Sequence, residues 1–126
     1  MSKINDFLTE AGTFFLATVD GEQPRLRPLG AHIEMDDKVI FCVGDFKNVY
    51  KQLQANPLCE VVACKKDGHW LRYTGKAVFE TDYKYAEAIM EIIPFLKTIY
   101  NEKTGNKLMC FHLEEATAVD IPMMGE

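Results

Sequence analysis

The sequence predicts a mainly β protein with short helices, folded as a small six-stranded antiparallel barrel. Short apolar segments of strand length alternate with hairpin signals such as Asp20-Gly21 and Asp67-Gly68. Helical periodicity is confined to three short stretches. Closing such strands into a barrel removes the exposed edges that an open sheet would leave, so we expect closure.

The first half of the chain is expected to form one helix followed by three strands. The apolar residues of that helix recur at helical spacing and are Ile4, Phe7, Leu8 and Ala11. Gly12 ends the helix, and strands follow over residues 14–19, 25–34 and 39–43. The last of these, VIFCV, is apolar throughout, which indicates a strand covered on both faces.

The second half combines helices and strands. Helices are expected over residues 47–55 and 83–93, because each apolar periodic stretch stops near a proline, Pro57 or Pro94. Strands are expected over residues 58–65, 69–80, 108–114 and 118–121.

Composition limits the function classes. A chain of 126 residues fits a single domain, residues 1–126. The net charge of -5, with no basic run, disfavours nucleic acid as a partner. The longest uncharged stretch near the N-terminus, residues 11–19, is too short to span a membrane. We therefore expect a cytoplasmic protein that binds neither nucleic acid nor membrane.

The cysteines are expected to be buried free thiols rather than metal ligands. They are Cys42, Cys59, Cys64 and Cys110. No C-x-x-C spacing or nearby histidine pair accompanies them, and free cysteine is among the most buried residue types.

The segment GDFKNVYKQLQANP, residues 44–57, places Lys47 and Asn48 at the start of a helix. Helix N-termini present unpaired N–H groups and a partial positive charge, and both favour a phosphate. Lys47 would add a full charge. The alternative is that Asp45 caps the helix and that Lys47 and Asn48 are merely solvated.

The segment PRLRPLG, residues 24–30, places Arg25 and Arg27 on one face of a strand. Pro28 marks an edge or a bulge, where backbone groups become available to a ligand. Two solvent-facing arginines on an edge strand are the alternative. Strict alternation puts both arginines on the same face as the apolar Leu29, so we expect a one-residue slip at Pro28.

The segment HWLRYTGKAVF, residues 69–79, alternates between a core face and an outer face. The outer face includes Trp70 and Arg72, a composition preferred at interfaces. A tryptophan partly buried beneath the C-terminal strands is the alternative.

Together these segments resemble the pyridoxamine 5'-phosphate oxidase-like family of FMN-binding split barrels, especially its short, nitroimidazole-reductase-like members. The resemblance covers nearly the whole chain. It rests on LATVDGEQPRLRPL, VIFCVGDFKNVYKQLQANPLCEVV and HWLRYTGKAVFETD, in this order and spacing.

The resemblance implies a split barrel that forms a homodimer with two FMN sites at the subunit interface. It assigns the phosphate to Lys47 and Asn48, and a place across the dimer to Trp70 and Arg72. The implied cofactor-binding residues are Arg25, Leu26, Arg27, Pro28, Val43, Gly44, Lys47, Asn48, Trp70 and Arg72.

The sequence is compatible with more than one activity. The chain ends at IPMMGE, without the arginine-rich C-terminal segment of pyridoxamine phosphate oxidase itself, so vitamin B6 oxidation is not implied. His69 and His112 are candidates for substrate contact or proton delivery. The expected function is an FMN-dependent oxidoreductase acting on a small molecule. The alternatives are a flavin-binding, storage or redox-sensing protein without turnover and, more weakly, a haem-binding split barrel.

Overall fold

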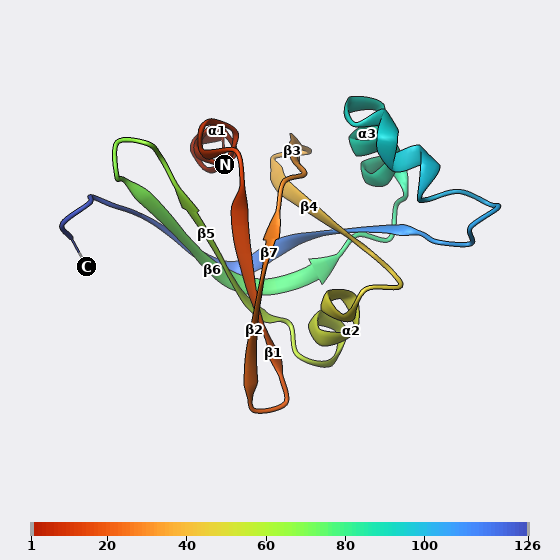
Figure 1. Cartoon of the computed structure of the whole chain (residues 1–126), viewed down its shortest axis with the longest axis horizontal. Coiled ribbons are helices and arrows are strands. Elements are labelled where there is room, and N and C mark those ends of the chain that lie inside the picture. The colour runs from red at the N-terminus through yellow and green to blue at the C-terminus, as the bar shows by residue number, and fades with distance from the viewer. Residues whose placement is uncertain (1, 126) are drawn as a thin grey trace.

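A curled antiparallel sheet forms the body of the molecule (Figure 1). The computed structural model describes residues 2–125. The strand order is β2-β1-β5-β6-β7-β4-β3, so β2 and β3 are the two edges. The strands are β1 Phe14–Asp20, β2 Gln23–Leu29, β3 His32–Met35, β4 Lys38–Gly44, β5 Leu58–Cys64, β6 Trp70–Phe79 and β7 Leu108–Ile121. The mainly β class is therefore confirmed within the described residues, where the sheet has seven strands, as many as the segments expected from the sequence and one more than the six of the expected barrel.

Within residues 2–125, three α-helices and a 3-10 helix surround the sheet. They are α1 Ser2–Ala11, α2 Asn48–Ala55, α3 Lys84–Ile92 and the 3-10 helix η1 Pro94–Thr98. In Figure 1 the β1–β2 hairpin projects from the body of the sheet, and α2 lies beside it. Helix α2 packs on β1 and β4, and α1 packs near β3 and β5. No described helix is long and apolar enough to cross a membrane.

Strand β4 is covered on both faces, as its apolar run predicted. Phe41 and Val43 belong to the main core beneath α1 and α2, whereas Ile40 and Cys42 belong to a second core beneath α3. This double burial holds the strand firmly, so Gly44 at its end has a fixed position.

The expected slip at Pro28 does not occur. The ladder between β1 and β2 runs without a shift, with Phe15 opposite Pro28 and Leu16 opposite Arg27. Because β2 is an edge strand, a missing N–H is tolerated there without a bulge. The chain instead leaves β2 after Leu29 and begins β3 at His32, which divides the expected strand 25–34. Arg27 therefore shares the inward face of β1 and β2 with Leu16.

The two expected closing strands are one strand, β7. Its ladder with β6 shifts register between Thr74 and Lys76, and Glu115 has a φ of 49° at this point. A β-carbon on Gly75 would lie 2.9 Å from the carbonyl oxygen of Glu114. The kink thus brings the two backbones together, and the polar stretch around Glu115 belongs to the sheet rather than to a loop.

The cysteine prediction holds for three thiols and is wrong for one. Cys42, Cys59 and Cys110 are buried, whereas Cys64 is exposed because it lies on the outward face at the end of β5. Burial raises the pKa of each of the three buried thiols to about 12.

We expect Cys64 to react first with a disulfide reagent such as DTNB at pH 8. The reactive species is the thiolate, which is scarce at a buried thiol with a pKa near 12. The absorbance of the released thiolate, followed at constant pH, should show that one thiol per chain reacts fast. After unfolding in guanidinium, all four thiols should react. Cys64→Ser should abolish the fast phase, and a fast phase that persists in this variant would contradict the burial of the other three.

Candidate functional site

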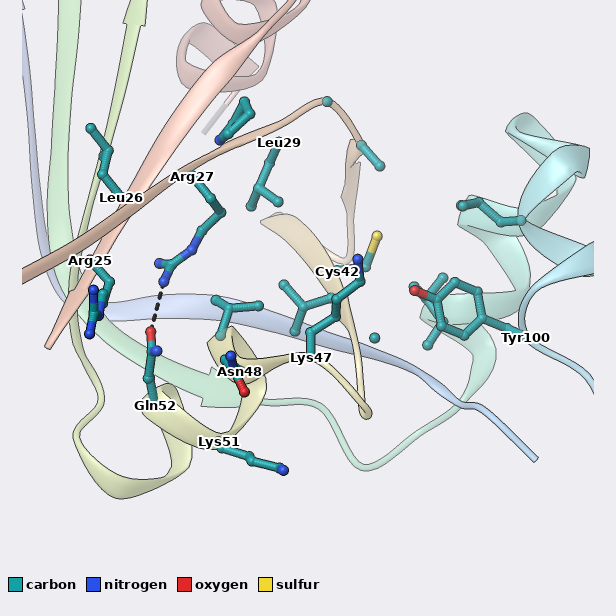
Figure 2. A pocket seen from close by; sticks show the side chains of 18 of the residues that line it. Arg25, Leu26, Arg27, Leu29, Cys42, Lys47, Asn48, Lys51, Gln52 and Tyr100 are labelled. Carbon is teal, nitrogen blue, oxygen red and sulfur yellow. Dashed lines mark hydrogen bonds between the residues drawn. The ribbon is translucent and has the colours of Figure 1, made fainter. Parts of the chain in front are cut away.

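A cavity of about 1010 Å³ opens between β2, the end of β4 and α2, with the segment after η1 on its far side (Figure 2). Its volume is at the upper end of the range for small-molecule and cofactor sites. The lining residues are Asp20, Arg25, Leu26, Arg27, Pro28, Leu29, Gly30, Ala31, Cys42, Val43, Gly44, Lys47, Asn48, Val49, Lys51, Gln52, Leu96, Tyr100 and Leu108.

Positive charge is concentrated on this cavity. Four cationic side chains line it, and they are Arg25, Arg27, Lys47 and Lys51. Asp20 is the only acidic residue of the lining, and its carboxylate lies 3.1 Å from Nε of Arg25. Because the whole chain carries a net charge of -5, this excess of cations is a local feature. The cavity is thus suited to an anionic ligand.

Arg27 is held by neutral oxygen atoms. Its Nη1 donates to the carbonyl oxygen of Leu16 at 3.1 Å and to Oγ1 of Thr18 at 2.7 Å. Its Nη2 donates to Oε1 of Gln52 at 2.7 Å. Partial burial, and then the nearby charge of Arg25, lower the pKa of Arg27 below its ordinary value. A guanidinium remains charged at neutral pH, so this half-buried cation lacks a carboxylate partner among the described residues.

Lys47 and Asn48 stand where α2 begins. Lys47 occupies the N-cap position without a side-chain cap, and its Nζ lies 5.4 Å from the ring centre of Phe46. Asp45 does not cap this helix. Its carboxylate accepts the backbone N–H of Lys107 at 3.0 Å instead, because the loop is tied to the start of β7. The capping alternative is therefore wrong.

The wall across the cavity from Arg25 is formed by the end of β4 and by Tyr100 (Figure 2). A β-carbon on Gly44 would lie 2.6 Å from the Tyr100 hydroxyl and 2.9 Å from the Phe46 ring. Glycine is thus the residue that allows Tyr100 to approach the strand. Burial, as the largest cause, raises the pKa of Tyr100, so its hydroxyl stays protonated at neutral pH.

Eight of the ten predicted cofactor-binding residues line this one cavity. They are Arg25, Leu26, Arg27, Pro28, Val43, Gly44, Lys47 and Asn48. Trp70 and Arg72 are not among the lining residues. They lie together on the outward face of β6, where the Arg72 guanidinium is 4.9 Å from the Trp70 ring and Nε of Arg72 is 3.5 Å from Glu60.

The two candidate histidines lie outside the cavity. His69 pairs with Asp120 at 2.9 Å, at the far end of the β6–β7 ladder. Nδ1 of His112 contacts Glu80, and its Nε2 lies 2.8 Å from Glu114. Within one chain, therefore, neither histidine is placed to meet a ligand in the cavity.

Four further residues belong to the site but were missed from the sequence. Lys51 and Gln52 lie one helical turn after Lys47 and Asn48, so helical periodicity could have found them. Thr18 follows Leu16 in the inward alternation of β1 and is 3% exposed. Tyr100 comes from a distant loop, and no local sequence signal places it beside Gly44.

Residues 1–120 match the family described as pyridoxamine 5'-phosphate oxidase. None of the curated proteins compared with the chain matches it significantly. Among solved structures, the chain is similar to a NimC/NimA family protein from Clostridium acetobutylicum, with 32% identity and a TM-score of 0.89. That match covers 100% of this chain and 87% of the other.

More distant structures share the fold. A pyridoxamine 5'-phosphate oxidase-related, FMN-binding protein from Nostoc punctiforme matches with 14% identity and a TM-score of 0.63, covering 94% of this chain and 82% of the other. A haem-binding protein from Mycobacterium smegmatis matches with 12% identity and a TM-score of 0.67, covering 90% of this chain and 50% of the other. At these identities the similarity concerns the fold alone.

Proposed function

Since the chain belongs to the pyridoxamine 5'-phosphate oxidase family, we propose that it binds FMN and acts as an FMN-dependent oxidoreductase on a small molecule. The observation that carries this proposal is the charge of the cavity. Four cations and one acid surround a space large enough for a cofactor, in a chain that is acidic overall.

The residues present fit a flavin phosphate. Lys47 supplies an ammonium group that makes no ion pair with a described residue, at the start of α2, where the first backbone N–H groups of the helix also lack a side-chain cap. Asn48 adds an amide beside it. Arg25 and Arg27 line the cavity from β2, and the apolar Val43 lines the opposite wall. These residues would bind and orient the cofactor, whose ring supplies the hydride chemistry when it is bound.

We propose further that a second copy of the chain completes the site. The outward face of the sheet exposes large apolar side chains, with Phe15 40%, Leu26 67% and Val119 50% exposed. Trp70 and Arg72 lie on this same face, opposite to the core face of β6. A twofold, isologous dimer would cover the face and bring these two residues toward the partner's cavity.

The alternative of a flavin-binding protein without turnover is favoured by one observation. Within the described chain no histidine lines the cavity, and burial raises the pKa of Tyr100, so neither a histidine nor an ionised tyrosine is available there for proton transfer near neutral pH. A flavin protein needs no such group for hydride transfer alone, since the ring carries that step. Lys47 and Asn48 favour a phosphorylated ligand over haem.

Titrating the purified protein with FMN, followed by anaerobic addition of NADH or NADPH, tests the proposal. We expect a yellow complex with a micromolar or tighter dissociation constant, and bleaching of its absorbance near 450 nm by a nicotinamide donor. A protein that leaves FMN fluorescence unchanged would exclude the flavin site. Tight binding without bleaching by either donor would favour the non-catalytic alternative.

A further inference from the structure

Arg27 differs from the other cations of the cavity because its guanidinium is fixed. Arg25 is half-exposed, and its ion pair with Asp20 involves two residues that line the cavity. Arg27 makes three hydrogen bonds to three different residues, the strand carbonyl of Leu16 and the side chains of Thr18 and Gln52. Figure 2 shows Arg27 reaching from β2 toward Gln52 on α2.

The three acceptors form a connected cluster. Oγ1 of Thr18 donates to Oε1 of Gln52 at 2.6 Å, so Gln52 accepts from both Thr18 and Arg27. Thr18 is 3% exposed and occupies an inward position of β1, where Phe14 and Leu16 precede it as core residues. A buried polar side chain in an apolar row requires hydrogen-bond partners, and Arg27 and Gln52 provide them.

The cluster also determines which N–H groups of Arg27 are left to bind a ligand. A guanidinium carries five N–H groups, and these bonds use both hydrogens of Nη1 and one of Nη2. Because Oγ1 of Thr18 and Oε1 of Gln52 lie 2.6 Å apart, they face the edge that Nη1 and Nη2 share. The donors left over by these bonds are Nε–H and the second N–H of Nη2, which are parallel on another edge of the planar group. Such an edge fits two acceptor atoms that lie side by side, as in a phosphate or in the pyrimidine edge of a flavin ring.

We propose that Gln52 and Thr18 are positioning residues that hold this two-donor edge of Arg27 toward the ligand. The inference rests on the proposed function, because it assigns Arg27 a share in binding the flavin. Gln52 and Thr18 act through Arg27, so their effect on binding should vanish when Arg27 is absent.

The test measures FMN and riboflavin binding by fluorescence in Gln52→Ala, Arg27→Ala and the double variant. We expect Gln52→Ala to weaken FMN about tenfold, and the double variant to bind no worse than Arg27→Ala alone. If riboflavin binding weakens as much as FMN binding, the two-donor edge of Arg27 contacts the flavin ring. If only FMN binding weakens, this edge contacts the phosphate. The matched control is Gln54→Ala, because Gln54 on the same helix is exposed and bonds Tyr50 instead. Additive losses in the double variant would overturn the proposal.

A second readout needs no flavin. In the ligand-free protein, the Arg27 side-chain N–H signals in a 1H–15N spectrum should be resolved, and they should broaden or average in Gln52→Ala and Thr18→Val. Thr18→Ser retains the hydroxyl and should restore them. Arg27 signals that are unchanged in Gln52→Ala would refute the positioning role. If the unsubstituted protein bound no flavin, the proposed function would fail, and the Arg27 signals alone would decide the role of Gln52 and Thr18.

Discussion

Lys47→Ala is expected to weaken FMN binding by roughly ten- to a hundredfold and to leave riboflavin binding nearly unchanged. A charge-assisted hydrogen bond contributes about 1.5 to 3 kcal/mol, which corresponds to that range of affinity. Lys47 makes no ion pair with another described residue, so its removal leaves no buried partner behind and should cost little stability. Flavin fluorescence titrations of both ligands measure the difference.

Comparing the affinities for FMN and riboflavin makes this prediction specific to the phosphate. Riboflavin has the same ring and ribityl chain as FMN but no phosphate, so a general distortion of the cavity would weaken both. Lys66→Ala is the control for the loss of one positive charge, because Lys66 is exposed in the turn between β5 and β6, away from the cavity lining. Equal losses of FMN and riboflavin in Lys47→Ala would remove Lys47 from the phosphate site.

The elements that carry the site could be predicted because their signals are local. The strand 39–43 is apolar throughout, and the structure buries it on both faces. The helix before Pro57 follows from its periodicity and from the proline that ends it, and the structure begins it one residue later than expected, at Asn48. The face of β6 that carries Trp70 and Arg72 follows from strict alternation.

The facing of Arg25 and Arg27 could not be predicted, because it depends on which strand β2 pairs with and where β2 ends. Alternation places the arginines on the same face as the apolar Leu29, and the expected slip at Pro28 would have reversed the facing of the residues that follow it. The structure keeps the alternation and provides a cavity on the inward side instead. Arg27 lies inside because Thr18 and Gln52 offer it acceptors there, and these come from segments 9 and 25 residues away.

The position of Tyr100 could not be predicted either, because it also depends on contacts between distant segments. It reaches the cavity from beyond η1 and meets Gly44, which is far from it in the sequence. A glycine at the end of a strand is compatible with many turns, so it did not indicate an aromatic neighbour. Contacts of this kind follow from tertiary packing of the second core, where Leu96 and Tyr100 pack against buried residues of β4 and α3.

Mixing Lys47→Ala chains with Arg72→Ala chains is expected to restore tight FMN binding that neither variant shows alone. If Arg72 acts across a dimer, each site combines Lys47 of one chain with Arg72 of the other. A heterodimer then contains one intact site and one site that lacks both residues. The measurement is the stoichiometry of tightly bound FMN after subunit exchange, with light scattering to establish that the protein is a dimer.

The position of Arg72 within one chain explains why the experiment is informative. Arg72 faces outward on β6, stacked on Trp70 and beside Glu60, and it does not line the cavity of its own chain. Any effect of Arg72→Ala on FMN binding therefore requires either the partner subunit or a loss of stability, and complementation separates these two causes.

Lys76→Ala is the matched control, because Lys76 is an outward-facing cation on the same strand that pairs with Glu115 at 2.8 Å. We expect Lys76→Ala to bind FMN as the unsubstituted protein does. Subunit exchange that is demonstrated by mass spectrometry but recovers no tight site would place Trp70 and Arg72 outside the partner's cavity, and the outward face of β6 would then serve only the packing of the sheet.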